Sequence, residues 1–314
     1  MITTLLVSLF TFIELNCENL FDTQHDTLKN DYEFTPNGSY HWTHTRYWHK
    51  LNHIGQEIVA LGDDSIHGWQ LPDMVALCEV ENDSVLRDLT QRSLLRKAHY
   101  KYFITNSPDE RGIDVALLYQ PASFSPIRTY AIRIKPSKNM RPTRDILYTC
   151  GQIINNDTLH IFVVHAPSRY GGEKISRPHR LLVAQYLADA IDSVRNKSPQ
   201  ARIIIAGDFN DYTSSPSLEA IYTHNMKDIS AKAIGSHGAK GTYRYQGEWG
   251  SLDHILCSPP ACNNIISCYI GDLPFLLEKD EKYGSVHPMR CYQGPRYQNG
   301  YSDHLPLVAR FVIH

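Results

Sequence analysis

The sequence has little excess charge of either sign. It contains 31 Lys and Arg residues against 33 Asp and Glu residues, which gives a formal net charge of −2 at pH 7. Proteins that hold nucleic acid mainly by its phosphate backbone carry an excess of basic residues. The near-neutral charge therefore argues against tight, nonspecific DNA binding by the whole chain, although it is compatible with a local basic groove.

The chain also lacks the usual signatures of a zinc site. Its seven cysteines are scattered without a CxxC pair, and no HExxH sequence occurs. A zinc hydrolase is therefore not expected, since its ligands follow such spacings. An odd, scattered set of cysteines is typical of free thiols in a reducing compartment, which predicts a cytoplasmic location.

A hydrophobic run of membrane-spanning length is missing as well, so no membrane span is expected. The apolar N-terminus, MITTLLVSLFTFIELN, has no Lys or Arg before the run and no clear A-x-A cleavage site. We interpret Leu9–Leu15 as the first core strand. The alternative is a secretory signal, in which case the protein would be exported.

What the sequence does contain is many apolar strand-like segments with a few helices between them and no long linker. This pattern predicts one α+β domain over residues 1–314, in which two sheets pack face to face with helices outside. Apolar residues at helical spacing predict helices from Tyr47 to near Gly62, over Val85–Leu95 and within Ile175–Val194. Further strands are expected at 73–82, 100–105, 113–119, 124–134, 146–154, 158–165, 203–206, 253–257, 265–269 and 307–312.

Several predicted strands end in the residue types of metal and phosphate chemistry. The stretches are ELNCENLFD (14–22), VALCEVEN (75–82), FVVHAPSR (162–169), IIIAGDFN (203–210), GSLDHI (250–255) and YSDHLPL (301–307). One such ending is usually turn chemistry, but strand ends that meet at one rim of a sheet would collect these groups in one cleft. A hard cation such as Mg²⁺ or Mn²⁺ prefers the oxygens that Glu79, Asp208, Asn210 and Asp303 supply.

These stretches resemble the endonuclease/exonuclease/phosphatase superfamily, which includes DNase I, exonuclease III-type enzymes and inositol polyphosphate 5-phosphatases. The resemblance runs from Asn16 to Leu307 in the family's order, and GDFN and SDHLPL are its most specific parts. LCEVEN is similar to the family's L-Q-E motif, with Cys78 where Gln is usual. The resemblance implies a four-layer α-β-β-α sandwich with two mixed, mostly antiparallel sheets (DNase I-like), and a divalent-metal phosphoesterase that uses Mg²⁺ or Mn²⁺.

The resemblance also implies a metal site. Carried over position by position, Glu79 would be the main metal ligand, Asn16 would lie beside it, and Asp303 would be a further ligand.

Five other residues would carry the catalytic roles. Asp208 would orient or deprotonate the attacking water, and Asn210 would hold the phosphate or the metal. Asp253 would orient His304, which would be a base or would stabilise the transition state. His165 corresponds to the family histidine that contacts the scissile phosphate.

Three arginines are weaker candidates for binding the substrate phosphate: Arg111, Arg144 and Arg169. A surface ion pair is an equally good interpretation of each. Glu110, beside Arg111, is an alternative partner for His165.

The remaining polar features are given structural interpretations. His254 and His160 are expected to pack or to be solvated, and Asp211 to be a cap or turn residue. TRYWHK (45–50) is read as a helix start, although a nucleic-acid surface would look similar. TYRYQGEWGS (242–251) fits either a substrate-lining loop or a hairpin.

The resemblance implies that the substrate is a phosphate ester, and the sequence leaves the class of that ester open. The leading prediction is a nuclease-like phosphodiesterase, whose partner would be nucleic acid. The alternatives are a hydrolase of a small sugar-phosphate or lipid head-group ester, and an inactive binding protein on the same fold. No protein partner is implied.

Overall fold

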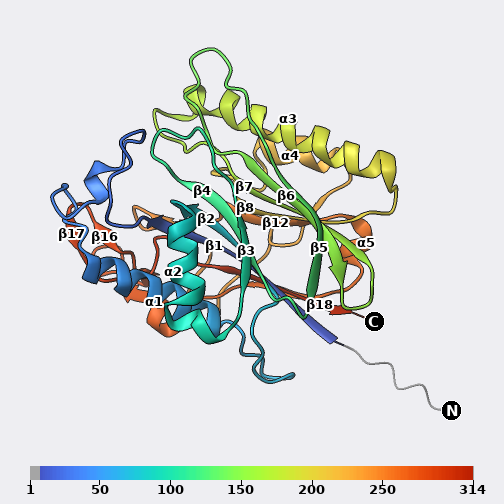
Figure 1. The fold of residues 1–314 in the computed structure, drawn as a ribbon, viewed down its shortest axis with the longest axis horizontal. Helices are drawn as coiled ribbons and strands as arrows, with labels where there is room; N and C mark the ends of the chain where they lie inside the picture. The colour runs from blue at the N-terminus through green and yellow to red at the C-terminus, as the bar shows by residue number, and fades with distance from the viewer. Residues whose placement is uncertain (1–7, 314) are drawn as a thin grey trace.

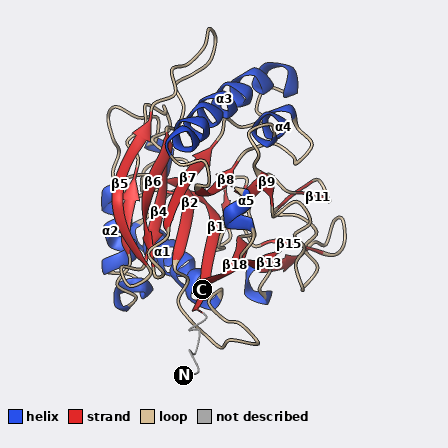
Figure 2. Cartoon of the chain, turned by 90° about the vertical axis from the view of Figure 1, so that its right-hand side faces the viewer, coloured by secondary structure: helices blue, strands red, loops and turns tan. Residues whose placement is uncertain are grey.

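The computed structural model describes residues 8–313, and its core is a pair of six-stranded sheets packed face to face (Figures 1 and 2). In spatial order the first sheet contains β13 (Ile265–Ile270), β18 (Leu307–Ile313), β1 (Ser8–Leu20), β2 (Met74–Val80), β4 (Asp114–Tyr119) and β3 (Lys101–Ile104). The second contains β5 (Phe124–Ile132), β6 (Ile146–Ile153), β7 (Thr158–His165), β8 (Arg202–Asp208), β12 (Asp253–Cys257) and β9 (Lys227–Asp228). Within the two sheets β1 pairs with β2 and β7 with β8 in parallel, and the other neighbours pair antiparallel.

Helices cover the outer face of each sheet. Figure 1 shows α1 (His44–Ala60) and α2 (Asp83–Gln91) on the side of β1 and β2, and α3 (Glu173–Lys197) and α4 (Pro216–Tyr222) on the opposite side. The core clusters agree, because residues of α1 and α2 pack with the first sheet and residues of α3 and α4 with the second. The fold is the predicted α+β sandwich with helices outside.

Side-chain alternation in the first strand explains the layering. Phe10 and Phe12 lie between the two sheets, whereas Ile13 and Leu15 point to the helices on the outer face. The same inward alternation brings Asn16 to the interior side of the sandwich. Because β1 lies between β18 and β2, the predicted first strand is a central strand.

The remaining elements are short. Three 3-10 turns occur at Tyr32–Phe34, Leu94–Lys97 and Pro274–Leu276, and α5 spans Pro259–Cys262. Three hairpins are formed by β10 (Tyr243–Tyr245) with β11 (Glu248–Gly250), β14 (Leu277–Lys279) with β15 (Val286–Pro288), and β16 (Tyr292–Gln293) with β17 (Arg296–Tyr297). The undecided stretch at 242–251 is therefore a hairpin.

Two predicted boundaries differ from the structure by more than three residues. The first strand extends to Leu20 rather than ending at Leu15, because it continues through an irregular segment beside β2. The helix predicted over Val85–Leu95 ends at Gln91, and Ser93 caps a separate 3-10 turn by accepting the Leu95 N–H. Among residues 8–313, the structure contains no helix long and apolar enough to cross a lipid bilayer.

Helix α1 buries the side chain of Glu57, which should make the free energy of unfolding depend on pH. Both carboxylate oxygens of Glu57 are buried and have no hydrogen-bond partner among residues 8–313, and burial raises the pKa of Glu57 to about 8 despite the nearby Lys50 ammonium. A carboxyl group with a raised pKa in the folded state favours folding at low pH and loses that contribution as the pH rises from about 4.5 to about 8. We expect Glu57→Gln to raise the free energy of unfolding at pH 9 by about 2–4 kcal/mol relative to its effect at pH 4.5.

Urea denaturation at the two pH values measures this difference. Glu219→Gln, at an exposed position of α4, is the matched control and should show no such pH-dependent gain. Equal effects of Glu57→Gln at both pH values would contradict the assignment of a neutral, buried Glu57.

Candidate active site

The backbone is irregular and strained near the C-terminal ends of β1 and β2. Pairing of β2 with β4 shifts register between Cys78 and Val80, so that Glu79 bulges out of the ladder with φ = 62°. Glu18 and Asn19 in the facing part of β1 also have left-handed backbones, with φ = 48° and 58°. Such conformations cost non-glycine residues about 1–3 kcal/mol each and gather at functional sites. The bulge fixes where Glu79 points, and the Asn19 N–H donates to its Oε2 atom at 2.9 Å.

Three neighbouring strands of the second sheet place a row of polar residues beside Glu79. His165 on β7 is the register partner of Asp208 on β8, which in turn pairs with Asp253 on β12. Gly207 makes this row possible, because a Cβ there would lie 1.8 Å from the Val164 carbonyl oxygen. Asn16 joins the row from the other sheet by donating from Nδ2 to Asp208 Oδ2 at 3.1 Å.

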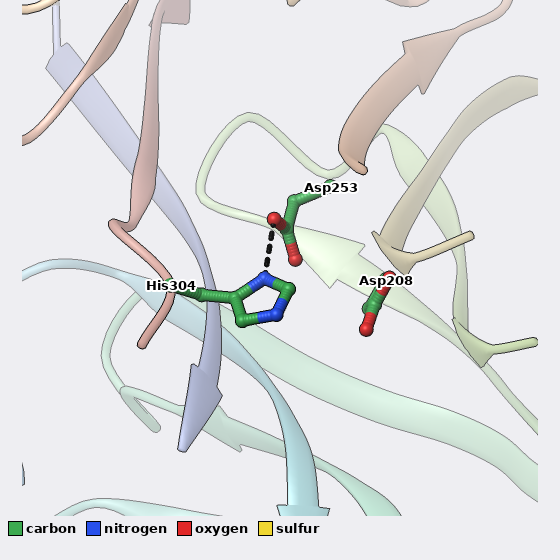
Figure 3. A group of neighbouring side chains, drawn as sticks. All are labelled: Asp208, Asp253 and His304. Carbon is green, nitrogen blue, oxygen red and sulfur yellow. Dashed lines mark hydrogen bonds and ion pairs between the residues drawn. The ribbon is translucent and has the colours of Figure 1, made fainter. Parts of the chain in front are cut away.

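His304 reaches the row from the loop before β18. Its Nδ1 atom lies 2.8 Å from Asp253 Oδ2, and its other ring nitrogen faces Asp208 (Figure 3). One ligand atom from each of these three residues lies within 4.8 Å of the others. Ser302 holds the backbone here, since its hydroxyl donates to the Asn16 carbonyl oxygen at 2.6 Å and accepts the His304 N–H at 3.1 Å.

The side chain of Asn210 lies beside Asp208, as predicted, but the backbone conformation that brings it there differs from the prediction. Strand β8 ends at Asp208, and Asn210 has φ = 51°, so strand alternation does not bring the two side chains together. The left-handed turn does so instead, because Asn210 donates from its backbone N–H to Asp208 Oδ1 at 2.8 Å and from Nδ2 to Oδ2 at 3.1 Å.

The surroundings of Asp208, His304 and His165 shift the pKa of each side chain in a different way. Burial and the neighbouring Asp253 raise the pKa of Asp208 to about 7. Burial lowers the pKa of His304, but the carboxylates of Asp253 and Asp208 outweigh it and hold that pKa well above its usual value. Burial and the Arg144 guanidinium lower the pKa of His165 well below its usual value. His304 therefore holds a proton at neutral pH and His165 does not.

The cluster has the donor chemistry of a divalent-cation site. Asp208 and Asp253 are buried, Asp253 Oδ1 has no hydrogen-bond partner, and Glu79 is partly open to solvent. The carboxylates of Asp253 and Glu79 both raise the pKa of Asp208, and a bound cation would relieve that repulsion. Carboxylate and amide oxygens fit Mg²⁺ or Mn²⁺, and Glu79 with Asn16 would hold the ion.

Two of the candidate arginines are engaged within the protein. Arg144 is buried and donates to the carbonyl oxygens of His165 and Ala166 at 3.2 and 2.6 Å, and to Asp109 at 3.1 Å. It therefore fixes the end of β7. Arg169 pairs with Asp211 and Glu173, at 3.1 and 3.0 Å.

Arg111 is the candidate arginine that faces the cluster. Its guanidinium lies 3.6 Å from Glu79 Oε2 and donates to the Asn19 side chain, and its side chain is 44% exposed. Glu110 lies 3.8 Å from Arg141, not beside His165, whose Nε2 faces Glu79 Oε1 at 3.8 Å and Asp208 Oδ2 at 3.6 Å.

Asp303 directly precedes His304, and its carboxylate pairs with Arg290, a residue that the sequence analysis did not identify. Arg290 donates to Asp303 Oδ2 at 2.6 Å. Thr242 was missed too, and its hydroxyl donates to Asp253 Oδ2, the oxygen that faces His304. No motif marks Arg290, whereas Thr242 begins the stretch TYRYQGEWGS, and Glu18 and Asn19 lie inside ELNCENLFD, so these three could have been found there.

The residues given structural interpretations have structural partners. His254 lies 2.8 Å from Asp228 Oδ2 and from the Asp211 carbonyl oxygen, and His160 lies 2.8 Å from the Tyr148 hydroxyl. Tyr47 is buried on the inner side of α1. All seven cysteines lie among the described residues and are free.

Asp211 turns away from the cluster into a buried ion pair. Its Oδ2 atom lies 2.7 Å from Arg180 Nε, both side chains are inaccessible to solvent, and Ser217 donates to the same carboxylate at 2.5 Å. We expect Arg180→Met to lower the free energy of unfolding by about 3 kcal/mol, because it removes the buried partner of Asp211 and leaves the partly exposed Arg169 as its cation. Urea denaturation checks this, and the double variant Arg180→Met/Asp211→Asn should recover part of the loss; no recovery would contradict the pairing.

Comparisons with known proteins identify the family and the fold. A family model described as "Endonuclease/Exonuclease/phosphatase family" matches residues 11–312. A family protein from Bacteroides thetaiotaomicron is 14% identical, covers 98% of this chain and 99% of its own, and superposes with a TM-score of 0.62. A mannosyl-6-phosphatase from the same organism is 16% identical, with coverages of 97% and 100% and a TM-score of 0.59. TDP2 from C. elegans is 15% identical, with coverages of 97% and 75% and a TM-score of 0.58.

No curated protein sequence gives a significant match. The pair of six-stranded sheets with helices outside has the DNase I-like fold of this family. The chain belongs to the endonuclease/exonuclease/phosphatase family and is an enzyme that hydrolyses phosphate esters.

Proposed function

We propose that the enzyme hydrolyses its phosphate ester by attack of a water molecule and depends on a divalent cation, Mg²⁺ or Mn²⁺. The observation that carries the proposal is the cross-strand row of His165, Asp208 and Asp253, completed by His304 at 2.8 Å from Asp253. The cation would polarise the phosphoryl oxygen and offset charge in the transition state.

The raised pKa values of Asp208 and His304 support different roles for the two residues. Asp208, with its pKa raised to about 7, suits a base that takes a proton from water near neutral pH. His304 keeps its proton and donates a hydrogen bond to a phosphoryl oxygen, while Asp253 holds the ring through Nδ1. We assign neutral His165 to the phosphate, since its ring N–H group can donate to a phosphoryl oxygen. Asn210 would join it by exchanging one of the two hydrogen bonds that its Nδ2 atom donates to the Ala166 carbonyl oxygen and to Asp208 Oδ2, at 3.1 Å each.

The substrate prediction divides between a nucleic-acid phosphodiester and a small ester. The pairing of the nearby basic residues supports the small ester, because Arg144, Arg169 and Arg290 each lie within 3.1 Å of a carboxylate. A guanidinium so neutralised contributes less to a nucleic-acid backbone site. The structural likeness to a mannosyl-6-phosphatase is consistent with a small sugar phosphate.

A panel assay with Mg²⁺ or Mn²⁺ tests both levels of the proposal. The panel contains plasmid DNA, an abasic oligonucleotide, RNA, bis-nitrophenyl phosphate, sugar phosphates, inositol phosphates and sphingomyelin. We expect turnover that stops in EDTA and returns with the cation. Turnover on the nucleic acids alone would favour the nuclease-like prediction, and no turnover on the whole panel would contradict metal-dependent hydrolysis.

The alternative of an inactive binding protein is disfavoured by the complete set of polar groups. A scaffold that had lost catalysis would not need His304 to be oriented by Asp253 or Glu79 to be presented from a strained bulge.

A further inference from the structure

A cavity of about 200 Å³ lies beside the catalytic cluster. It is smaller than the pockets of roughly 300–1,000 Å³ that bury drug-sized ligands, so it suits a single ring-sized group. The lining residues fall into an aromatic part and a polar part, of which the aromatic part is Phe34, Tyr40, Trp42 and Tyr292.

Two residues that line the cavity, Asn19 and Asp303, connect it to the catalytic cluster. Asn19 lines the cavity and donates from its backbone to Glu79 Oε2 at 2.9 Å. Asp303 lines it too and precedes His304 in the chain. A phosphate held between Glu79 and His304 would therefore have its ester group at the cavity mouth.

The aromatic part is a rigid surface. The Phe34 ring is stacked between Phe21 and Tyr40, with centroids 4.4 and 4.9 Å away, and Tyr40 lies 4.7 Å from Tyr292. Trp42 is fixed by a hydrogen bond from Nε1 to the Phe21 carbonyl oxygen at 2.9 Å. Phe21 and Tyr40 cover the faces of Phe34, and Trp42 is buried, so the half-buried Tyr40 is the aromatic ring most open to the C–H face of a bound ring.

The polar part alternates acceptors with a donor. The Arg290 guanidinium lies between two carboxylates, 2.6 Å from Asp303 Oδ2 and 3.8 Å from Glu18 Oε1. Its Nε atom is buried and has no hydrogen-bond partner among the described residues. Glu18 also accepts the Cys291 N–H at 2.6 Å, which fixes the segment that carries Arg290.

This combination matches the chemistry of a polyhydroxylated ring. Each hydroxyl of such a ring can donate to a carboxylate and accept from a guanidinium, while the ring's C–H face covers aromatic carbon. A quaternary ammonium group has no oxygen that could accept a hydrogen bond from Arg290, and a nucleobase does not need two carboxylate acceptors flanking one donor.

Resting on the function proposed above, we propose that this cavity is a subsite for the polyhydroxylated ring of a phosphate ester, and that Arg290 selects for that ring. A sugar phosphate and an inositol phosphate both carry such a ring, and separate assays of the two distinguish these sources.

The kinetic test compares substrates with and without the ring. We expect kcat/KM for glucose 6-phosphate or inositol 1-phosphate to exceed that for acyclic glycerol 3-phosphate by about tenfold or more. Arg290→Lys keeps the charge beside Asp303 but loses the fork, and should lower this ratio about tenfold, mainly through KM. Arg296→Lys, on the same hairpin but exposed and outside the cavity, is the matched control and should keep the wild-type ratio.

A binding measurement in EDTA separates this inference from the proposed catalysis. Titration with glucose 6-phosphate or inositol 1-phosphate should change the tryptophan fluorescence, glycerol 3-phosphate should not, and Trp42→Phe should remove the signal. Ring binding that Arg290→Lys weakens would support the subsite even if turnover were absent on every substrate. Turnover without ring preference, preference for nucleoside monophosphates, or no ring-dependent signal would each overturn it.

Discussion

Replacing Asp208 by Asn is expected to lower kcat/KM for a phosphate ester by about 10²–10⁴-fold, because an amide cannot take a proton from water. Asp208 lies at the centre of the cluster, where it accepts hydrogen bonds from Asn16 and Asn210. Burial and Asp253 raise its pKa to about 7, and a bound cation would lower it again, so the carboxylate is ionised and can accept a proton at the pH of the assay. Steady-state kinetics at saturating Mg²⁺ or Mn²⁺ measures the loss.

His304→Ala tests whether the two residues act as one unit. Because both would contribute to the same transition state, the double variant Asp208→Asn/His304→Ala should lose little more activity than the worse single variant. Asp189→Asn, at an exposed position of α3, is the matched control and should retain wild-type kinetics. Unchanged metal-dependent turnover in Asp208→Asn or His304→Ala would remove the catalytic assignment of that residue.

Much of the fold could be predicted because alternation and helical spacing follow directly from burial. The apolar alternation of β1 and the inward face of α1 gave the correct element types, and the boundaries were mostly right to within a few residues. That residues 1–314 form one domain, and that the protein is cytoplasmic, stay predictions. Residues 1–7, which contain the start of the apolar N-terminal run, lie outside the described residues.

The geometry of the candidate site could be predicted less well, because it depends on backbone irregularity and long-range pairing. Glu79 and Asn210 adopt left-handed backbones, for which residue-type patterns give little signal outside glycine. Strand alternation therefore gave the right neighbours for Asn210 but the wrong reason. The Arg290–Asp303 pair joins a hairpin to a distant loop through side chains alone, and no spacing in the sequence specifies such a contact.

Conversely, motif position could not distinguish a phosphate-binding arginine from a structural one. Arg144 follows the family pattern, yet it is buried against the carbonyl oxygens that end β7. Removing it would disturb the placement of His165, so loss of activity in an Arg144 variant would not by itself show phosphate binding.

The second large effect is expected at the metal site. Glu79→Gln should raise the Mg²⁺ or Mn²⁺ concentration for half-maximal activity by about 10- to 100-fold or more, because partners that merely orient a ligand already contribute this much. The amide keeps the size of the side chain and can still accept the Asn19 N–H, so the bulge should persist. Metal titrations of activity and of thermal stability measure the shift.

Two comparisons decide whether Glu79 acts through the ion. Glu110→Gln, on the nearby segment beside Arg111 but paired with Arg141, should leave the metal dependence unchanged. If Glu79 instead served only to neutralise Arg111 at 3.6 Å, then Glu79→Gln and Arg111→Met together would restore the wild-type metal dependence. A ligand role predicts that the double variant keeps the raised metal requirement, since neither remaining side chain supplies the lost carboxylate oxygen.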